Sequence, residues 1–318
     1  MFHGQPINAG SRCHEAMKWL CCQLGAREHY AIPRALLRRG MLAYLLTDAW
    51  ASSSSFLAKL CGHRLTDRFH NELNDAHVMA FNSSLALFET FALARGLGEW
   101  ERIIARNHWF QRKVVSFLRS QLSTISYQPI LLSYSYTAFE PFRYAKSQGW
   151  KTVLVQIDPG PEEERIVAEE AARVPELAGE WQPAPAEYWA SWRAECDLAD
   201  CIVVNSEWSR NGLMRSGVAT GKLAVIPLAY ETPEAAGQKT AGFAEARAAK
   251  EVRYARSYPA RFTQERPLCV LFLGQVNLRK GLARLLDAAR MLRDEPLEFW
   301  IVGPVQVANA MRMGMMHE

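Results

Sequence analysis

The feature that most constrains the fold is a pair of apolar runs, separated by a polar loop and an amphipathic stretch, within residues 268–304. The sequence there is LCVLFLGQVNLRKGLARLLDAARMLRDEPLEFWIVGP. The first run ends at Gly274, the loop carries Arg279 and Lys280, and the second run ends at Gly303. This pattern predicts a βαβ unit with a cationic loop at the carboxyl end of its first strand. In doubly wound folds, phosphorylated ligands sit at that position.

Strand and helix patterns also alternate in the N-terminal part of the chain. Short apolar runs are the predicted strands, at 19–24, 42–47, 130–136, 152–157, 200–205 and 223–227. Residues 99–120 carry apolar side chains near helical spacing, whereas 51–98 is expected to be mostly helical and irregular. Alternation on both sides of residue 230 predicts an α/β protein with two Rossmann-like halves that face each other across a cleft.

Three segments are predicted along the chain. Residues 1–230 form an N-terminal, acceptor-side domain, 231–266 a linker rich in Ala, Glu, Arg and Pro, and 267–318 a nucleotide-binding domain. The last segment has only 52 residues, whereas such a domain usually needs well over ~100. We therefore expect this second domain to be incomplete and to expose apolar sheet surface. We also expect the chain by itself to bind nucleotide poorly and to show little activity.

Composition and charge argue against several classes of protein. The net charge of +4 is too small to indicate a nucleic-acid-binding protein, and no apolar run approaches the ~18 residues of a membrane span. The seven cysteines contain no CxxC pair, which favours reduced thiols and a cytoplasmic location. A peripheral contact with the inner membrane, which needs only one surface helix, stays open. Without DxD, HExxH or GxGxxG motifs, neither a metal site nor a dinucleotide cofactor is expected.

Several segments together resemble one enzyme family. Residues 199–231 (ADCIVVNSEWSRNGLMRSGVATGKLAVIPLAYE), then 270–292 and FWIVGP, look like the central segment of family 4 glycosyltransferases of GT-B fold. Residues 23–40 (QLGAREHYAIPRALLRRG) resemble the first loop and helix of such enzymes. The resemblance implies a GT-B enzyme of polysaccharide biosynthesis that moves a sugar, with retention, from a UDP- or GDP-linked donor to a glycan, lipid or small acceptor. The nucleotide sugar is then a co-substrate, and no further cofactor is implied.

The resemblance also implies a donor site at the end of the first apolar run. Lys280 matches the family's lysine, which with an arginine stabilises the departing diphosphate. That arginine usually follows the glycine directly, where this chain has Gln275; either Arg279 replaces it or the stabilisation is weaker. The competing interpretation makes Arg279 and Lys280 the polar first turn of a surface helix, although cations there oppose the helix dipole. The expected donor-binding residues are Gly274, Gln275, Gly281 and Gly303.

On the acceptor side, candidates follow the predicted strands. Gly25 provides a tight turn after the first strand, and Arg27 and Glu28 are expected to contact ligand unless they are only solvated charges. Tyr136 and Asp158 end two later strands facing the cleft, although Asp158 could be only the turn residue before a proline. The resemblance implies a catalytic or acceptor-orienting histidine near such a strand end, and this chain has none there. Tryptophans between 181 and 192 either pack in the core or line an acceptor groove.

Two functions other than a glycosyltransferase are compatible with parts of the sequence. Gln275 and the missing histidine favour, to a small degree, a non-catalytic protein or remnant of the same fold. The family's acidic E-x7-E motif is expected beyond residue 318, so it offers no check. An NAD-dependent enzyme on paired Rossmann halves is disfavoured, because no glycine fingerprint follows either first strand.

Overall fold

The computed structural model describes residues 17–51, 68–121, 128–179, 181–228 and 261–307. The chain divides into two compact units. The N-terminal unit consists of 1–159 and 184–226, and the C-terminal unit of 160–183 and 227–318. Most of the predicted linker, 231–266, lies outside the described residues.

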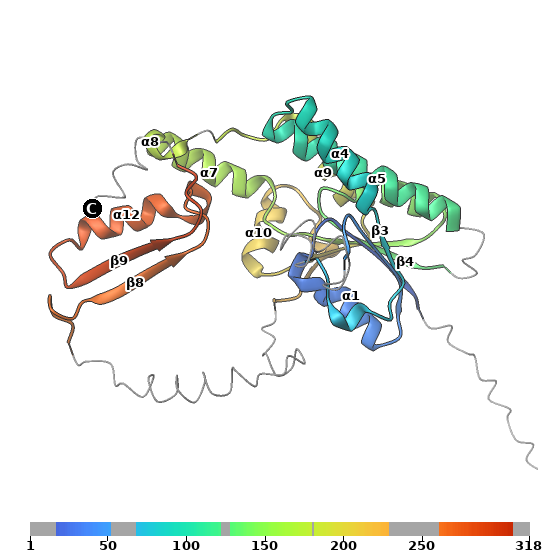
Figure 1. Cartoon of the computed structure of the whole chain (residues 1–318), viewed down its shortest axis with the longest axis horizontal. Coiled ribbons are helices and arrows are strands. Elements are labelled where there is room, and N and C mark those ends of the chain that lie inside the picture. The colour runs from blue at the N-terminus through green and yellow to red at the C-terminus, as the bar shows by residue number, and fades with distance from the viewer. Residues whose placement is uncertain (1–16, 52–67, 122–127, 180, 229–260, 308–318) are drawn as a thin grey trace, which may run out of the picture. The chain divides into compact units, whose positions relative to one another are not determined.

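The N-terminal unit is built on one seven-stranded sheet in which every neighbouring pair of strands is parallel. Its order is β3-β2-β1-β4-β5-β6-β7, with labels as in Figure 1. The strands are β1 (Trp19–Gln23), β2 (Leu42–Thr47), β3 (Val78–Ala80), β4 (Ile130–Tyr134), β5 (Lys151–Val155), β6 (Cys201–Val204) and β7 (Leu223–Val225). This is a doubly wound order whose direction reverses between β1 and β4. The predicted α/β class is confirmed.

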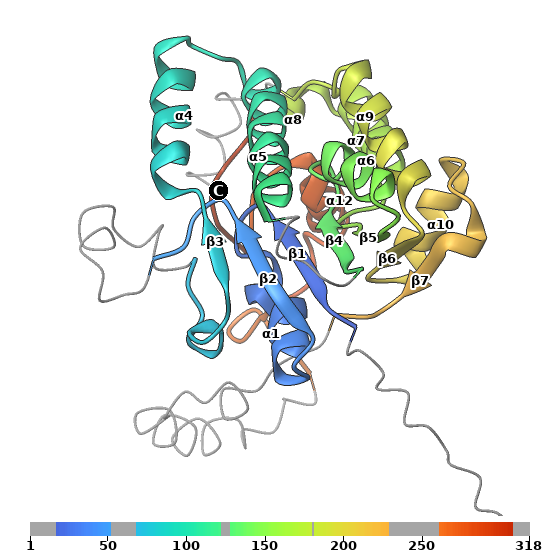
Figure 2. The ribbon, with the colours of Figure 1, turned by 90° about the vertical axis from the view of Figure 1, so that its right-hand side faces the viewer.

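Helices cover both faces of this sheet. They are α1 (Ala31–Arg38), α4 (Asn82–Ala94), α5 (Glu99–Gln121), α6 (Phe139–Ser147), α9 (Ala186–Leu198) and α10 (Glu207–Arg215). Leu20 and Cys22 pack with residues of α5, α6 and α9, whereas Cys21 between them packs with α1 on the opposite face. Figure 2 shows the strands fanned from β3 to β7 with these helices on the two sides. Because a parallel strand is buried on both faces, its sequence is a continuous apolar run. Such runs predict the strands directly from the sequence.

Among the strands that the structure describes, β3 is the one that the sequence did not predict. It lies within 51–98, where mostly helical and irregular structure was expected. Val78 pairs with Leu45 of β2, and Met79 is 37% exposed at this edge of the sheet. Three residues are too few to show an alternating pattern, so pairing with β2 rather than local preference defines this strand.

The C-terminal unit contains the predicted βαβ element. Strands β8 (Leu268–Leu273) and β9 (Leu297–Val302) are parallel. The 3-10 turn η5 (Leu278–Lys280) and helix α12 (Leu282–Met291) connect them. In Figure 1, α12 lies along one side of the strand pair. The unit also includes α7 (Pro161–Arg173) and α8 (Pro175–Ala178).

Helices α7 and α8 mark a difference from the predicted segments, which placed 160–183 in the N-terminal domain. Val167 and Leu177 are buried in one apolar cluster with Leu278 and Leu282. This packing joins residues about a hundred positions apart, so no local pattern in the sequence reveals it.

The other face of the β8–β9 pair is apolar and exposed. Leu271, Leu273 and Trp300 are 59%, 75% and 54% exposed. Sheets of parallel strands normally have both faces covered. The expectation that this segment exposes apolar sheet surface is therefore met by the described residues.

Candidate functional site

The carboxyl ends of β1 and β4 define the crevice where doubly wound folds bind ligands. The backbone after β1 is unusual there. Gly25 has a φ of 82°, and Glu28, His29 and Tyr30 follow in the left-handed region with φ of 51°, 49° and 60°. Each such non-glycine residue costs about 1–2 kcal/mol. Backbone strain of this kind clusters at binding and catalytic positions.

Packing of Tyr30 holds this strained turn in place. The side chain is 1% exposed, its hydroxyl donates to the carbonyl of Arg68 at 3.2 Å, and its ring meets Trp50 edge-on at 5.2 Å between centroids. Burial of the aromatic ring and its contact with Trp50 offset part of this strain. The loop shape is therefore set by the core below it.

A buried carboxylate anchors the start of the same loop. Asp48, directly after β2, accepts the backbone N–H of Gly25 at 2.9 Å and forms ion pairs with Arg68 and, at 2.8 Å, with Arg106 of α5. Asp48 is fully buried, so the two guanidinium groups offset its desolvation. Sequence reasoning missed Asp48; its position immediately after a buried strand was the available signal.

The predicted residues Gly25, Arg27 and Glu28 share this loop. The Glu28 carboxyl lies beside the hydroxyl of Tyr134, the last residue of β4, and partial burial raises the pKa of Glu28 above its ordinary value. Arg27 lies close enough to oppose that rise. The paired strands β1 and β4 therefore end here beside one acidic and one basic group.

The predicted residues Tyr136 and Asp158 are brought together. Tyr136 has a left-handed φ of 73°, and its hydroxyl donates to Asp158 Oδ1 at 2.6 Å. Gln156 Nε2 donates to the same oxygen at 2.9 Å, and Trp192 Nε1 donates to Gln156 Oε1 at 3.0 Å. Asp158 is thus more than a turn residue, because it fixes the Tyr136 ring.

Glu195, on α9, is a buried residue that sequence reasoning missed. Its carboxylate accepts the backbone N–H groups of Tyr136, Ala138 and Phe139 at 2.7, 2.7 and 3.2 Å. These contacts satisfy donors at the start of α6. Burial raises the pKa of Glu195 to about 8, although the N–H donors oppose the rise.

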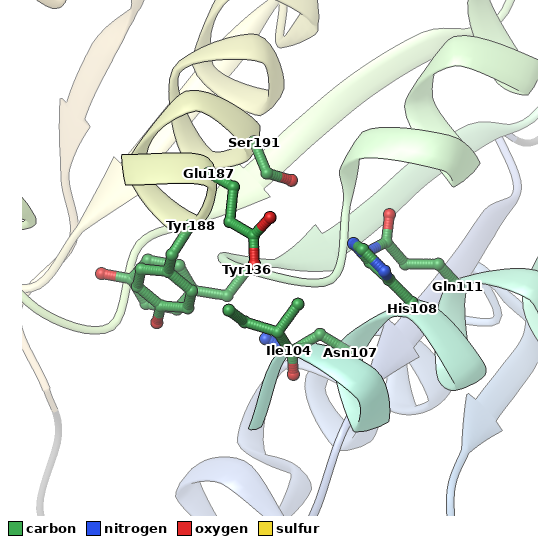
Figure 3. A pocket seen from close by; sticks show the side chains of 8 residues that line it. All are labelled: Ile104, Asn107, His108, Gln111, Tyr136, Glu187, Tyr188 and Ser191. Carbon is green, nitrogen blue, oxygen red and sulfur yellow. The ribbon is translucent and has the colours of Figure 1, made fainter. Parts of the chain in front are cut away.

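A small cavity lies beside Tyr136, with a volume of about 80 Å³. Helix α5 contributes Ile104, Asn107, His108 and Gln111. Helix α9 contributes Glu187, Tyr188 and Ser191. Figure 3 shows the Glu187 carboxylate and the His108 imidazole on opposite sides of the cavity. His108 lies on a helix and not at the strand ends, and it is exposed.

In the C-terminal unit, two glycines end the adjacent strands β8 and β9. Gly274 and Gly303 have φ of 142° and 146°. A Cβ on Gly303 would lie 1.8 Å from the Gly274 carbonyl oxygen, whereas a Cβ on Gly274 would meet nothing within 4 Å. Gly303 therefore permits the close approach of the two strand ends, and Gly274 leaves its backbone open on the outer side.

The loop after Gly274 carries the predicted cations. The Asn277 side chain accepts the backbone N–H of Lys280 at 3.1 Å, and Gly281, with a φ of 82°, leads into α12. Arg279 forms an ion pair with Glu163 of α7. Within the described residues, Lys280 has no carboxylate partner. Gln275 is exposed at the start of the loop.

The described residues contain no group of three or more His, Cys, Asp or Glu side chains arranged to hold a metal ion. In the same part of the chain, no helix combines the length and the apolar character needed to cross a bilayer.

Comparison with known proteins finds similarity at the level of structure. No protein-family model and no curated protein matches the sequence. TcCGT1 in complex with UDP is 12% identical with a TM-score of 0.43, over 91% of this chain and 74% of that one. UDP-GlcNAc 2-epimerase from Neisseria meningitidis bound to UDP-GlcNAc is 12% identical with a TM-score of 0.41, over 91% and 66%.

Anabaena HepE in complex with UDP-glucose is also 12% identical, with a TM-score of 0.43, over 94% of this chain and 64% of that one. The chain spans less than two thirds of the length of the epimerase and of HepE.

Proposed function

We propose that this chain is a nucleotide-sugar-dependent glycosyltransferase of GT-B architecture, similar to family 4. It moves a sugar from a UDP- or GDP-linked donor to a glycan, lipid or small acceptor. One observation carries the proposal: an open glycine backbone at Gly274 and the Lys280 ammonium belong to the same loop at the carboxyl end of β8. Retention of configuration is part of the proposal through the family resemblance alone.

The chemistry of the donor explains why these two features matter. Transfer leaves a nucleoside diphosphate with developing negative charge on its phosphate oxygens. A fixed cation stabilises that charge in the transition state, and a backbone without a Cβ lets phosphate approach closely. Lys280 supplies the cation, while Asn277 fixes the backbone from which it extends.

Arg279 has a different part in the proposal. Its guanidinium is engaged with Glu163, so we assign the phosphate contact to Lys280 and a loop-holding role to Arg279. Gln275 follows Gly274 at the position of the family's arginine, and it can donate amide hydrogen bonds to phosphate without adding charge.

The N-terminal unit supplies the acceptor side of the reaction in this proposal. The strained turn after Gly25 displays Arg27 and Glu28 at the crevice. The thiols of Cys21 and Cys22 are free and buried in β1, and we extend the proposal to a reducing compartment, the cytoplasm.

Calorimetric titration with UDP, GDP and NAD tests the proposal. We expect UDP or GDP to bind weakly and NAD not to bind. Lys280→Ala should weaken nucleotide binding about 10- to 100-fold, because a charged hydrogen bond is worth roughly 1.5–3 kcal/mol. Lys222→Ala, in the N-terminal unit, is the matched control and should leave the affinity unchanged.

Three outcomes separate the candidate functions. Nucleoside-diphosphate binding with sugar transfer supports the glycosyltransferase. Nucleotide binding without hydrolysis or transfer of any tested sugar supports a non-catalytic protein of the same fold, which the Arg279–Glu163 pair favours by removing one cation. Binding of NAD alone would overturn both.

A further inference from the structure

We propose that the cavity between α5 and α9 binds one neutral sugar residue through its hydroxyl groups. The cavity lies in the N-terminal unit and shares no residue with the cationic loop after β8. Its role as an acceptor subsite rests on the proposed function, whereas binding of the sugar itself does not.

Two helix faces converge on this cavity. Ile104, Asn107, His108 and Gln111 have the spacing i, i+3, i+4 and i+7, which places them on one face of α5. Glu187 and Ser191, four residues apart on α9, face the cavity from the other side. Tyr136 closes it from the loop after β4 (Figure 3).

The polar groups on the wall match a hydroxyl-rich ligand. Asn107 offers both a carbonyl oxygen and an NH2 group, His108 has two ring nitrogens, and Ser191 has a hydroxyl that both donates and accepts. Sugar hydroxyls also donate and accept, so they can pair with every one of these groups. Ile104 adds an apolar surface for the C–H face of a ring.

The orientation of one amide is fixed by the fold. Gln111 is 1% exposed, and its Oε1 accepts the backbone N–H of Glu140 at 2.8 Å. The other atom of the amide, Nε2, therefore carries the NH2 group. It has no hydrogen-bond partner among the described residues. This NH2 group belongs to a residue that lines the cavity, so a ligand hydroxyl or a water can accept its hydrogen bonds.

The charge of the wall argues against phosphate. Glu187 contributes a carboxylate, and none of the described lining residues is Lys or Arg. An anion would be repelled by Glu187, whereas a carboxylate can accept hydrogen bonds from two sugar hydroxyls. The nucleotide diphosphate of the donor is therefore the wrong ligand for this cavity.

Size and rigidity agree with a single sugar ring. Since one water needs about 10–15 Å³, the 80 Å³ cavity holds about six water-sized groups, which matches the six atoms of one pyranose ring without its substituents. The stacked rings of Tyr136 and Tyr188, 4.7 Å apart, and the bond from Tyr136 to Asp158 hold the wall. A wall fixed in advance lowers the entropy cost of binding.

Saturation-transfer NMR on the full chain without nucleotide tests this proposal. The probes are methyl glycosides of glucose, mannose and galactose, with glucosamine as a chemical control and inorganic phosphate as a competitor. We expect at least one methyl glycoside to bind with millimolar affinity and phosphate not to displace it. Glu187→Ala should weaken that binding at least 10-fold, and Ser191→Leu, which fills the cavity, should abolish it.

Asp197→Asn is the matched control, because Asp197 is an exposed carboxylate on the same helix outside the cavity. It should leave glycoside binding unchanged, and so should Lys280→Ala. Absence of saturation transfer to all three glycosides, or full affinity in both cavity variants, would overturn the proposal. Preference for glucosamine over every neutral glycoside would overturn it in favour of an amine ligand.

The two proposals fail separately. Glycoside binding without UDP or GDP binding would leave the sugar cavity standing and remove the glycosyltransferase. Nucleotide binding without glycoside binding would do the reverse. Circular dichroism of each variant distinguishes lost binding from lost folding.

Discussion

The Glu195 carboxylate accepts a 2.7 Å hydrogen bond from the backbone N–H of Tyr136, whose φ is 73°. One carboxylate on α9 thus holds the left-handed residue that closes the sugar cavity. Its second oxygen accepts the N–H groups of Ala138 and Phe139 at the start of α6. The cavity wall and the α6 terminus therefore depend on the same buried group.

Glu195→Gln should destabilise the chain by about 1–3 kcal/mol. Glutamine keeps one oxygen for Ala138 and Phe139, but it places an NH2 group opposite the N–H of Tyr136. Urea unfolding followed by Trp fluorescence measures the loss. Asp197→Asn on the same helix should change stability by less than about 0.5 kcal/mol, since the residue is exposed. Equal effects for both variants would contradict the capping role.

Glu195 should also make stability depend on pH. Burial raises its pKa from 4.5 to about 8, so the folded chain binds this proton more tightly than the unfolded chain does. The stabilisation that the protonated Glu195 side chain gives to the folded chain is fully present below its ordinary pKa of 4.5. This stabilisation is lost as pH rises from that value through about 8. The free energy of unfolding should fall by up to roughly 1.4 kcal/mol per pH unit in this window. Denaturant titrations from pH 5 to 9 should show this slope in the wild type and its absence in Glu195→Gln.

Asp48→Asn should cost about 3 kcal/mol, because it leaves Arg68 and Arg106 without their shared buried partner. The Gly25 hydrogen bond to Oδ1 can persist, so the loss reports mainly the missing charge. Glu207→Gln breaks a more exposed pair with Arg210, outside this network, and should cost less than about 1 kcal/mol. Thermal unfolding compares the two variants, and a loss at Asp48 as small as that at Glu207 would contradict the anchoring role.

Gly303→Ala should destabilise the C-terminal unit by more than about 3 kcal/mol, since its Cβ would lie 1.8 Å from the Gly274 carbonyl oxygen. Gly274→Ala is the matched variant, because it shares the positive φ but meets no atom within 4 Å. It should cost only the backbone strain, about 1–2 kcal/mol. Hydrogen exchange of the β8 and β9 amides measures the stability lost in each variant. Equal losses of stability would show that the close approach of the two strand ends does not require glycine at position 303.

Leu273→Thr should reduce self-association without lowering stability. Leu273 is 75% exposed on the uncovered face of β8, and apolar patches of this kind promote association. Ile301→Thr is the matched variant on the opposite face, where Ile301 packs against the α7–α12 cluster, and it should destabilise the unit. Sedimentation velocity and dye binding follow the change. If Leu273→Thr self-associates as much as the wild type, this face of the sheet does not mediate the association.

Elements defined by local pattern could be predicted from the sequence. Strand β2 was placed at its observed residues, 42–47, because a strand buried on both faces is a continuous apolar run. The βαβ unit from β8 to β9 was predicted for the same reason. Ser206 is of a residue type that favours the N-cap position, and its hydroxyl accepts the backbone N–H of Ser209 at 3.2 Å at the start of α10.

Features that depend on distant contacts could not be predicted. Asp48 finds its arginines 20 and 58 residues along the chain, so no spacing rule connects them. The α5 face that lines the sugar cavity has the spacing of any amphipathic helix, and its exposed His108 resembles a solvated residue. This face of α5 lines a cavity only because α9 lies opposite it.

Residues 160–183 belong to the C-terminal unit, yet they are encoded between β5 and β6 of the N-terminal unit. The C-terminal unit is therefore encoded by two separate segments of the gene. No single breakpoint in the gene leaves each unit whole on its own side. A chimera that exchanges only the residues after 226 would pair a new β8–β9 element with an old α7. Recombination between relatives preserves both units only when breakpoints near 159, 184 and 226 are used together.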